Sequence, residues 1–421
     1  MYMFYLKYLY YVHIMTGLTQ LVAVGAQDVF LTSNSGKSLW TKKCNRIKNF
    51  AVESIEQTPI GDINYGRRVS FVISRNGDLV TGVMLEITLQ RGGDGVPYYP
   101  SEHFIDRVEI VIGGQIIDTI THQWFRFYWE LFMSDQQQNA YQHMTNFDME
   151  PEGYIRKFYV PIPFWFSTLN SRSSALPLIA LQYHDVQINI HLTEGNIIQG
   201  INPLFKPKLS CWVDYVFLDT EERIDFASKQ HAYLIEQHQE QKMAVSVGTE
   251  SKSYNMNLNF NHPVTCLMWA LTPGETTHGQ YTSEPGEQNA EVLSPIESAV
   301  IKFNGIDRFD RRSGSYFSSA NPWLMCNGNY LSSGIYMYAF GFISGSNLNP
   351  PRGSMNFSRV DSAILSFTTK KAIVNNVYEP NVVDETMTTT TSNILNTLIV
   401  YACNYNMFRV ESGMGGLLFA N

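Results

Sequence analysis

Most of this chain consists of short runs in which apolar and polar residues alternate, and this pattern constrains the fold more than any other feature. In Leu79–Leu89 an apolar residue recurs at every second position from Val83 onward. Val186–Leu192 alternates in the same way. A period of two is typical of strands that are buried on one face. The sequence therefore predicts an all-β chain with few helices.

Two sets of such runs follow one another along the chain. In the first set, a β-rich run on each side of Gly113-Gly114 predicts a hairpin, and the last run ends at Leu218. The second set comprises residues 264–271, 299–303, 335–343, 362–368 and 398–405. Between the sets, the acidic first turn of Asp219–Arg223 predicts a short helix. We therefore expect two β domains with a boundary at about residues 219–235.

Another short helix is expected at Trp124–Met133, where large apolar residues gather on one side. Polar stretches that interrupt the strands are interpreted as surface loops, at residues 134–154, 272–291, 344–354 and 379–392. The predicted organisation is an N-terminal arm (1–43), a first β domain (44–218), a linker with a short helix (219–235) and a second β domain (236–421).

The composition favours a subunit of an assembly. Charged residues make up 16% of the 421 residues, against about 25% in a typical globular protein. Low charge suits a surface that is buried against other subunits, and an apolar segment such as Pro161–Phe166 is expected to lie in a contact between copies. The net charge of −8 argues against a protein that coats nucleic acid, because that function needs a basic face.

The cysteines predict neither a disulfide framework nor a zinc site. They are few, odd in number and far apart in the sequence, and no Cys-x-x-Cys occurs. They are Cys44, Cys211, Cys266, Cys326 and Cys403. We expect them to be buried free thiols.

Both ends of the chain are apolar and spaced by glycines. Residues 17–32 and 404–421 have no helical period and almost no charge, so they must lie against the rest of the chain or a neighbouring copy. Residues 1–14 are rich in Tyr and Phe, too short to span a bilayer, and lack a signal-peptide cleavage site. They are interpreted either as an extension upstream of Met15 or as an anchor at a membrane interface.

The two ends also resemble those of major capsid proteins from large nucleocytoplasmic DNA viruses, the group of iridoviruses, chlorella viruses and marseilleviruses. Similar segments continue in order through the interior, at residues 49–57, 108–118, 161–166, 176–184, 212–215, 233–237, 260–264, 303–309 and 356–361. The resemblance covers about Met15 to Asn421. A single motif of this kind would be weak, whereas eight or more in order are specific.

The resemblance implies a double jelly roll, which is two tandem eight-stranded antiparallel sandwiches with a few short helices. It implies a structural capsid protein without catalytic activity or cofactor, whose homotrimers form pseudo-hexagonal capsomers that tile an icosahedral shell. The expected partners are other copies of the chain, minor capsid proteins and an internal viral membrane beneath the shell, but no nucleic acid. The expected location is the virion capsid, assembled in the host cytoplasm.

The N-terminal arm is expected to run outside the first β domain and to bind beneath the shell. Its apolar residues between Leu18 and Leu31 are accompanied by one charge, Asp28, so the arm needs a surface that covers it.

Glycine-rich motifs that suggest nucleotide chemistry are incomplete. Gly36-Lys37-Ser38 ends like a phosphate-binding loop, but Leu31 occupies the position of the first required glycine. The segment that begins at Gly413 has Leu418 where a dinucleotide fingerprint needs its last glycine. Neither an ATPase nor a dinucleotide-binding protein is therefore expected.

Histidine placement also argues against an enzyme. His184 and His191 are seven residues apart and no His-x-His occurs, so the sequence does not predict the metal centre of a cupin-type jelly roll. The neighbours His184 and Asp185 are interpreted as a structural pair and not as part of a catalytic triad.

Asn356-Phe357-Ser358 is the only Asn-x-Ser/Thr sequence in the chain, which makes Asn356 a candidate glycosylation site. Because it overlaps a segment that resembles the capsid family, we expect a buried turn there.

Three classes of function were weighed. The first is the structural capsid protein, and the alternative is a minor virion jelly-roll protein that binds a receptor or carbohydrate. A jelly-roll enzyme is the third. The alternative predicts a solvent-facing cluster of loop aromatics, but Tyr141, Tyr154 and Tyr281 are scattered along the sequence.

Overall fold

The computed structural model describes residues 48–93, 99–147, 150–167, 174–195, 198, 200–247, 250–273, 295–326, 334–342, 353–370 and 394–419. The predicted N-terminal arm and almost all of the predicted loops at 272–291, 344–354 and 379–392 lie outside these residues.

The first sandwich consists of two facing sheets. Its strands are β1 (Phe50–Gln57), β2 (Pro59–Ile60), β3 (Arg68–Val72), β4 (Leu79–Gln90), β5 (Ile105–Ile112), β6 (Gln115–Thr121), β7 (Ile155–Pro161), β8 (Val186–Leu192) and β9 (Lys208–Leu218). One sheet has the order β1-β9-β4-β7, and the other has the order β2-β3-β8-β5-β6. All pairings within these sheets are antiparallel.

The second sandwich is built in the same way. Its strands are β10 (His231–Val247), β11 (Ser253–Asn257), β12 (Pro263–Pro273), β13 (Ile296–Phe303), β14 (Ile306–Asp307), β15 (Arg312–Ser313), β16 (Ile335–Ala339), β17 (Met355–Asn356), β18 (Ala363–Thr369), β19 (Ile394–Glu411) and β20 (Met414–Leu417). One sheet has the order β10-β19-β12-β16, with β17 on β12 and β20 on β19. The other has the order β11-β18-β13-β14, with β15 on β13.

The two sandwiches share one strand order. If β2, β15, β17 and β20 are set aside and the two-residue strand β14 is kept, the described part of each sandwich has eight strands, which pair as 1-8-3-6 in one sheet and 2-7-4-5 in the other. Such pairing of early with late strands is how a jelly roll folds two sheets face to face. The predicted double jelly roll is confirmed, and the sandwiches are called the first and second roll below.

The alternation in the sequence determines which face of each strand is buried. In β4 the side chains of Val83, Leu85 and Ile87 point into the first roll and are at most 4% exposed. The predicted hairpin joins β5 to β6, and both Gly113 and Gly114 have positive φ, as a two-residue turn requires.

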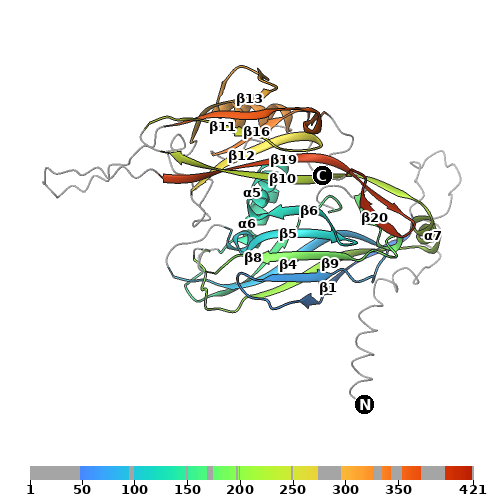
Figure 1. The fold of residues 1–421 in the computed structure, drawn as a ribbon. Coiled ribbons are helices and arrows are strands. Elements are labelled where there is room, and N and C mark those ends of the chain that lie inside the picture. The colour runs from blue at the N-terminus through green and yellow to red at the C-terminus, as the bar shows by residue number, and fades with distance from the viewer. Residues whose placement is uncertain are drawn as a thin grey trace, which may run out of the picture.

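Figure 1 shows the four sheets stacked as layers, with the β2-β3-β8-β5-β6 sheet of the first roll facing the β10-β19-β12-β16 sheet of the second. One apolar core lies within the second roll. The other fills the first roll and continues across to the facing sheet of the second, where it includes Met268, Ile399 and Tyr401. The rolls are therefore joined by packed apolar side chains.

Short helices occupy the connections. They are α4 (Pro100–His103), α5 (His122–Phe132), α6 (Asp135–Thr145), η2 (Leu178–Ala180), α7 (Thr220–Ser228), η3 (Tyr316–Ala320), α8 (Asn321–Met325) and η4 (Phe357–Arg359). The predicted helix at Trp124–Met133 is α5. The helix predicted to begin at Asp219–Arg223 is α7, whose N-cap Asp219 accepts a hydrogen bond from the Thr220 N–H.

The prediction of a loop over residues 134–154 is wrong for its first half, which forms α6. Ser134 and Gln137 form a capping box that begins this helix. Tyr141 fixes the helix to the core, because its ring is 1% exposed and stacks on Trp129 with 4.1 Å between ring centroids. The buried side chains described on α6 are Tyr141 and the polar Thr145, so the helix has almost no apolar period, although its Ser-x-x-Gln capping signal was present in the sequence.

The boundary between the rolls also differs from the prediction. Strand β10 begins at His231, inside the predicted linker at 219–235, so the second roll starts directly after α7.

Candidate functional site

The junction between the rolls is the candidate functional site, because their relative orientation determines the shape that one chain contributes to an assembly. Helix α5 fills the junction from the first roll. The Trp124 ring lies 4.3 Å from the His238 ring and 5.5 Å from the Tyr401 ring, measured between centroids. The Phe127 ring meets Tyr401 edge-on at 5.4 Å. These aromatic contacts place β10 and β19 of the second roll directly against the first.

A buried ion pair joins β6 to β10 beside these rings. The Asp118 carboxylate accepts a hydrogen bond from the His238 backbone N–H at 3.0 Å, and its other oxygen lies 2.9 Å from His238 Nδ1. The side chains are 0% and 7% exposed. Burial alone would lower the pKa of His238, but the adjacent Asp118 carboxylate outweighs it and raises the pKa. Loss of either partner would leave a buried charge uncompensated, which is strongly destabilising.

Two carboxyl groups, the buried Glu102 and the half-buried Glu236, hold their protons more tightly than usual. Burial raises the pKa of Glu236, next to this ion pair on β10, to about 7, and the nearby His238 only partly opposes the shift. Burial likewise raises the pKa of Glu102 on α4 to about 7, although the Arg126 guanidinium lies 3.9 Å away. Arg126 also lies 3.7 Å from Glu130 and over the Tyr99 ring.

The apolar C-terminal segment lies against its own chain. Strands β19 and β20 form a hairpin that packs on the first roll, where the Tyr183 N–H donates to the Gly413 carbonyl at 2.9 Å. His184 Nδ1 lies 2.9 Å from the Gly415 carbonyl oxygen. Gly415 is required by close packing, because a Cβ there would lie 2.6 Å from Leu181. The sequence left open whether this end lies against its own chain or against a neighbouring copy. The hairpin contacts its own chain through the backbone, while Met414, Leu418 and Phe419 remain exposed.

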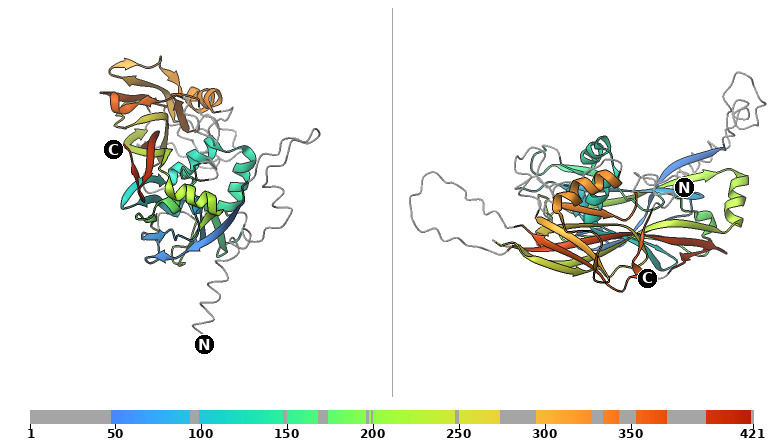
Figure 2. Two further views of the ribbon diagram at one scale, coloured as in Figure 1. Left: turned by 90° about the vertical axis from the view of Figure 1, so that its right-hand side faces the viewer. Right: turned by 90° about the horizontal axis from the view of Figure 1, so that it is seen from above.

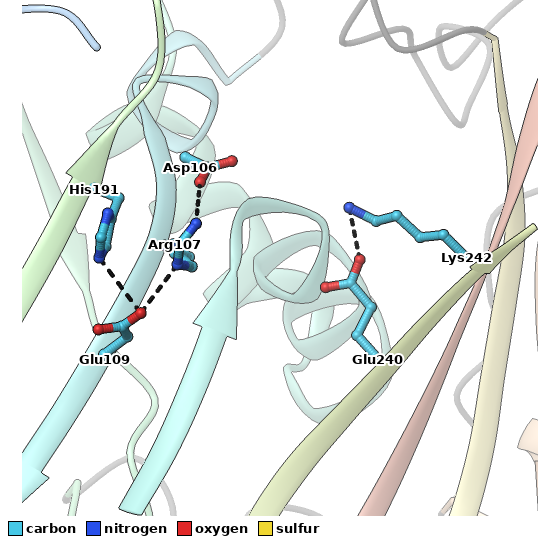
Figure 3. Close-up of polar contacts among 6 residues, drawn as sticks. All are labelled: Asp106, Arg107, Glu109, His191, Glu240 and Lys242. Atoms are coloured by element: carbon cyan, nitrogen blue, oxygen red, sulfur yellow. Dashed lines mark hydrogen bonds and ion pairs between the residues drawn. The ribbon is translucent and has the colours of Figure 1, made fainter. Parts of the chain in front are cut away.

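Polar side chains line the facing sheets beyond the apolar part of the junction (Figure 3). On the first roll, Glu109 lies 3.0 Å from Arg107 Nε and 3.4 Å from His191 Nε2. Burial alone would raise the pKa of Glu109, but hydrogen bonds from Arg107 and His191 and the charge of these groups lower it overall. On β10 of the second roll, Lys242 pairs with Glu240 at 2.8 Å. Arg107 also lies 3.1 Å from Asp106, so the charged side chains of each set pair within their own roll.

The two histidines considered as metal ligands lie at different places. His191 contacts Glu109, whereas His184 contacts the backbone of Gly415. Asp185 lies 3.5 Å from Arg75 and is 80% exposed, so it does not orient His184 as a triad carboxylate would. Within the described ranges, no group of three or more His, Cys, Asp or Glu residues could hold a metal ion.

Four of the cysteines are buried free thiols, namely Cys211, Cys266, Cys326 and Cys403, while Cys44 lies outside the described residues. Burial raises the pKa of Cys211 to about 12 and that of Cys403 well above its usual value, which makes these thiols unreactive. The fold brings Cys266 and Cys403 directly opposite each other on β12 and β19. Because the two cysteines are far apart in the sequence, this pairing could not be predicted from it.

Two predictions about exposure are corrected. Pro161–Phe166 is not free to form a contact between copies, because Phe164, Trp165 and Phe166 are already at most 5% exposed within this chain. The Trp165 ring lies 5.9 Å from Phe408 of β19, so the second roll contributes to the burial of this segment. Asn356 is exposed and not in a buried turn, and its side-chain oxygen accepts a hydrogen bond from the Ser358 N–H at 3.0 Å.

The two glycine-rich motifs of the sequence are the remaining candidates. The Gly36-Lys37-Ser38 motif lies outside the described residues, and Gly413 forms the turn of the C-terminal hairpin with φ +80°. No helix among the described residues is long and apolar enough to cross a membrane.

Comparison with known proteins agrees with the repeated fold. The family model "Major capsid protein N-terminus" matches residues 38–219, and the model "Large eukaryotic DNA virus major capsid protein" matches residues 222–416. The major capsid protein of Paramecium bursaria Chlorella virus 1 is 40% identical, over 96% of this chain and 99% of that protein. The major capsid protein of Pyramimonas orientalis virus is 32% identical over the same shares.

Solved structures show the same relation. The crystal structure of PBCV-1 VP54, fitted into a cryo-EM reconstruction of the virophage Sputnik, matches with a TM-score of 0.80 at 38% identity, covering 91% of this chain and all of that one. A chain of the quasi-atomic model of the PBCV-1 virus capsid matches with a TM-score of 0.79 at the same identity and coverage. The two family models together span most of the chain. The chain therefore belongs to the major capsid protein family of large eukaryotic DNA viruses and is a structural protein of the virion capsid.

Proposed function

We propose that three copies of this chain form a homotrimer, and that such trimers are the pseudo-hexagonal capsomers of an icosahedral shell. The observation that supports this is the repeated strand order of the two rolls across a buried junction. Two similar rolls in one chain give a threefold assembly six similar corners. We propose residues 44–218 and 231–421 as the two units that provide these corners, since β10 of the second roll begins at His231.

Contacts between copies need exposed apolar surface, and the second roll provides it on α8. Trp323 and Leu324 are 62% and 53% exposed, which is unusual for two adjacent large apolar residues. We place these residues in the contact with a neighbouring copy. Their five-residue helix is fixed by Asn321, whose side-chain oxygen accepts a hydrogen bond from the Ala339 N–H at 3.1 Å.

Light scattering of the purified chain at micromolar concentration tests the trimer. The expected mass is three times that of one chain, and a monodisperse monomer contradicts the proposal. The double variant Trp323→Asp/Leu324→Asp should shift the mass towards the monomer. Leu204→Asp, which changes a leucine that is 92% exposed on the first roll, is the matched control and should remain trimeric.

The other expected properties follow from this role. We propose that the trimer binds minor capsid proteins and an internal membrane through its inner side, where the arm (1–43) lies outside the first roll. We propose that the chain assembles in the host cytoplasm, binds no nucleic acid and has no catalytic activity. Asn356 remains the candidate for glycosylation, which the intact mass of the virion protein tests.

The alternative of a receptor- or carbohydrate-binding minor protein has less support. It predicted loop aromatics facing solvent, but Tyr141 lies on helix α6 with its ring buried, and only Tyr154, 46% exposed, remains among the described candidates. Mass spectrometry of purified particles separates the two functions, because a major shell protein dominates the signal.

A further inference from the structure

Five large apolar side chains are exposed on three segments that meet beside the C-terminal hairpin. The segments are the start of β6, the residues before β8, and β20 with the two residues that follow it, and the five side chains are 50–75% exposed. They are Ile116, Tyr183, Met414, Leu418 and Phe419, and are called the base patch below. These three segments meet because Leu417 N–H points to the Gln115 side-chain oxygen, and Tyr183 packs on Gly413.

The base patch contains an open depression. Met414 and Leu418 stand on the same face of the hairpin, four residues apart, and Gly416 between them carries no side chain. A Cβ on Gly416 would meet only the Gln115 side-chain oxygen, at 3.6 Å. The depression has a volume of about 390 Å³ and is bordered by the Arg409–Glu411 ion pair.

The outer edge of β20 is already occupied at two points. His184 contacts the backbone of Gly415, and the Gln115 side chain contacts the Leu417 N–H. A partner is therefore not expected to extend the sheet as a further strand. It would lie across the hairpin face and insert apolar side chains between Met414 and Leu418.

The described chain begins close to this patch. Phe50 at the start of β1 pairs with Leu218, and His231 at the start of β10 pairs with Val410 of the hairpin. Only α7 separates Leu218 from His231, and a nine-residue helix is about 14 Å long. Lys48 also lies 2.6 Å from Glu222 of α7. Figure 1 shows α7 and β20 at the same end of the molecule.

The segment that precedes Lys48 has the composition that the patch requires. Residues 18–31 include seven large apolar side chains and one charge, Asp28. The 17 residues from Leu31 to Lys48 can extend to about 55 Å, which is several times the length of α7. We propose that residues 18–31 of the N-terminal arm lie across the base patch of the same chain. The inference rests on the proposal that the arm lies outside the first roll, but not on the trimer or the shell.

Hydrogen–deuterium exchange of the full chain tests the inference. In the wild type, amides in residues 18–31 should exchange about tenfold more slowly than in the unfolded chain. Met414→Asp/Leu418→Asp, which changes the patch, should remove this protection. Leu21→Asp/Val24→Asp, which changes the arm, should have the same effect. Ile306→Asp, which changes an isoleucine that is 74% exposed on the second roll, is the control and should leave it unchanged. The melting temperature of each variant shows whether it is folded.

Two exchange results overturn the inference, namely unprotected amides in the wild type, or protection that survives Met414→Asp/Leu418→Asp. A photo-crosslinker at Val24 in mixed heavy- and light-isotope chains identifies the copy that holds the arm. Crosslinks within one isotope support the same chain, whereas heavy–light crosslinks assign the patch to a neighbouring copy and contradict the proposal. Light scattering on the same samples reports the trimer separately, so failure of one proposal is distinguishable from failure of the other.

Discussion

The two rolls use the same connection in opposite ways. In the first roll, α5 and α6 lie in the connection between β6 and β7. In the second roll, η3 and α8 lie in the equivalent connection, between β14 and β16. Figure 2 shows these helices on the same side of the stacked sheets. Trp124 on α5 is 1% exposed and packs in the junction, whereas Trp323 on α8 is 62% exposed. Two helical connections at the same place in the strand order therefore need not have the same role. Their role depends on whether the other roll packs against them.

Among single substitutions, the largest effect is expected from a matched pair of tryptophans. Trp124→Ala should lower the free energy of unfolding by about 3–5 kcal/mol, because it leaves a cavity among His238, Phe127 and Tyr401. Trp323→Ala should lower it by less than about 1 kcal/mol in the isolated chain. Urea unfolding of both variants measures the difference. Equal losses would show that the two insertions are not used differently.

The pH dependence of stability should come from the first-roll helices and the junction. Folding raises the pKa of Glu102 and Glu236 from 4.5 to about 7. The folded state therefore holds these protons more tightly, so the stabilisation is complete below about pH 4.5 and is lost as the pH rises through 7. At 1.36 kcal/mol per pKa unit, each group contributes on the order of 3 kcal/mol.

Unfolding at pH 5.5 and at pH 8 measures this contribution. The double variant Glu102→Gln/Glu236→Gln should reduce the change and leave the part that comes from the raised pKa of His238, whereas Glu221→Gln, at an exposed position on α7, should not alter it. An undiminished slope in the double variant would assign the titration to other groups.

A smaller difference in melting temperature is expected between glycine substitutions in two hairpin turns, one in each roll. Gly114 and Gly413 both have φ near +80°, so alanine at either position costs about 1–2 kcal/mol of backbone strain. Only at Gly413 would the new Cβ also meet a ring, at 2.6 Å from Tyr183. Gly413→Ala should therefore lower the melting temperature more than Gly114→Ala. Equal shifts would mean that the C-terminal hairpin does not depend on its contact with the first roll.

The smallest effect is expected at His184. His184→Ala removes a contact with the Gly415 backbone and should cost about 1 kcal/mol. Thermal unfolding measures the loss, and metal analysis after chelation is the control. A stoichiometric metal that is retained by the wild type and lost in the variant would contradict a purely structural role.

The sequence by itself determined the elements whose reason is local. The period of two in β4 and β8 follows from burial on one face, and Gly113-Gly114 predicted the β5–β6 hairpin because few other residues accept positive φ. The acidic first turn after Asp219 predicted α7. The order of motifs along the chain was sufficient to indicate the capsid family and hence the double jelly roll.

Only the tertiary structure decided which apolar and charged residues meet. Asp118 and His238 are separated by 120 residues, and neither has a local pattern that identifies its partner. Pro161–Phe166 reads as unpartnered surface until the second roll is placed against it, and Cys266 meets Cys403 only through the pairing of β12 with β19. Local periodicity predicts that a side chain is buried, but it does not identify the residue that the side chain contacts. That contact depends on which distant strands become neighbours when the two sheets of each roll pack face to face and the rolls pack together.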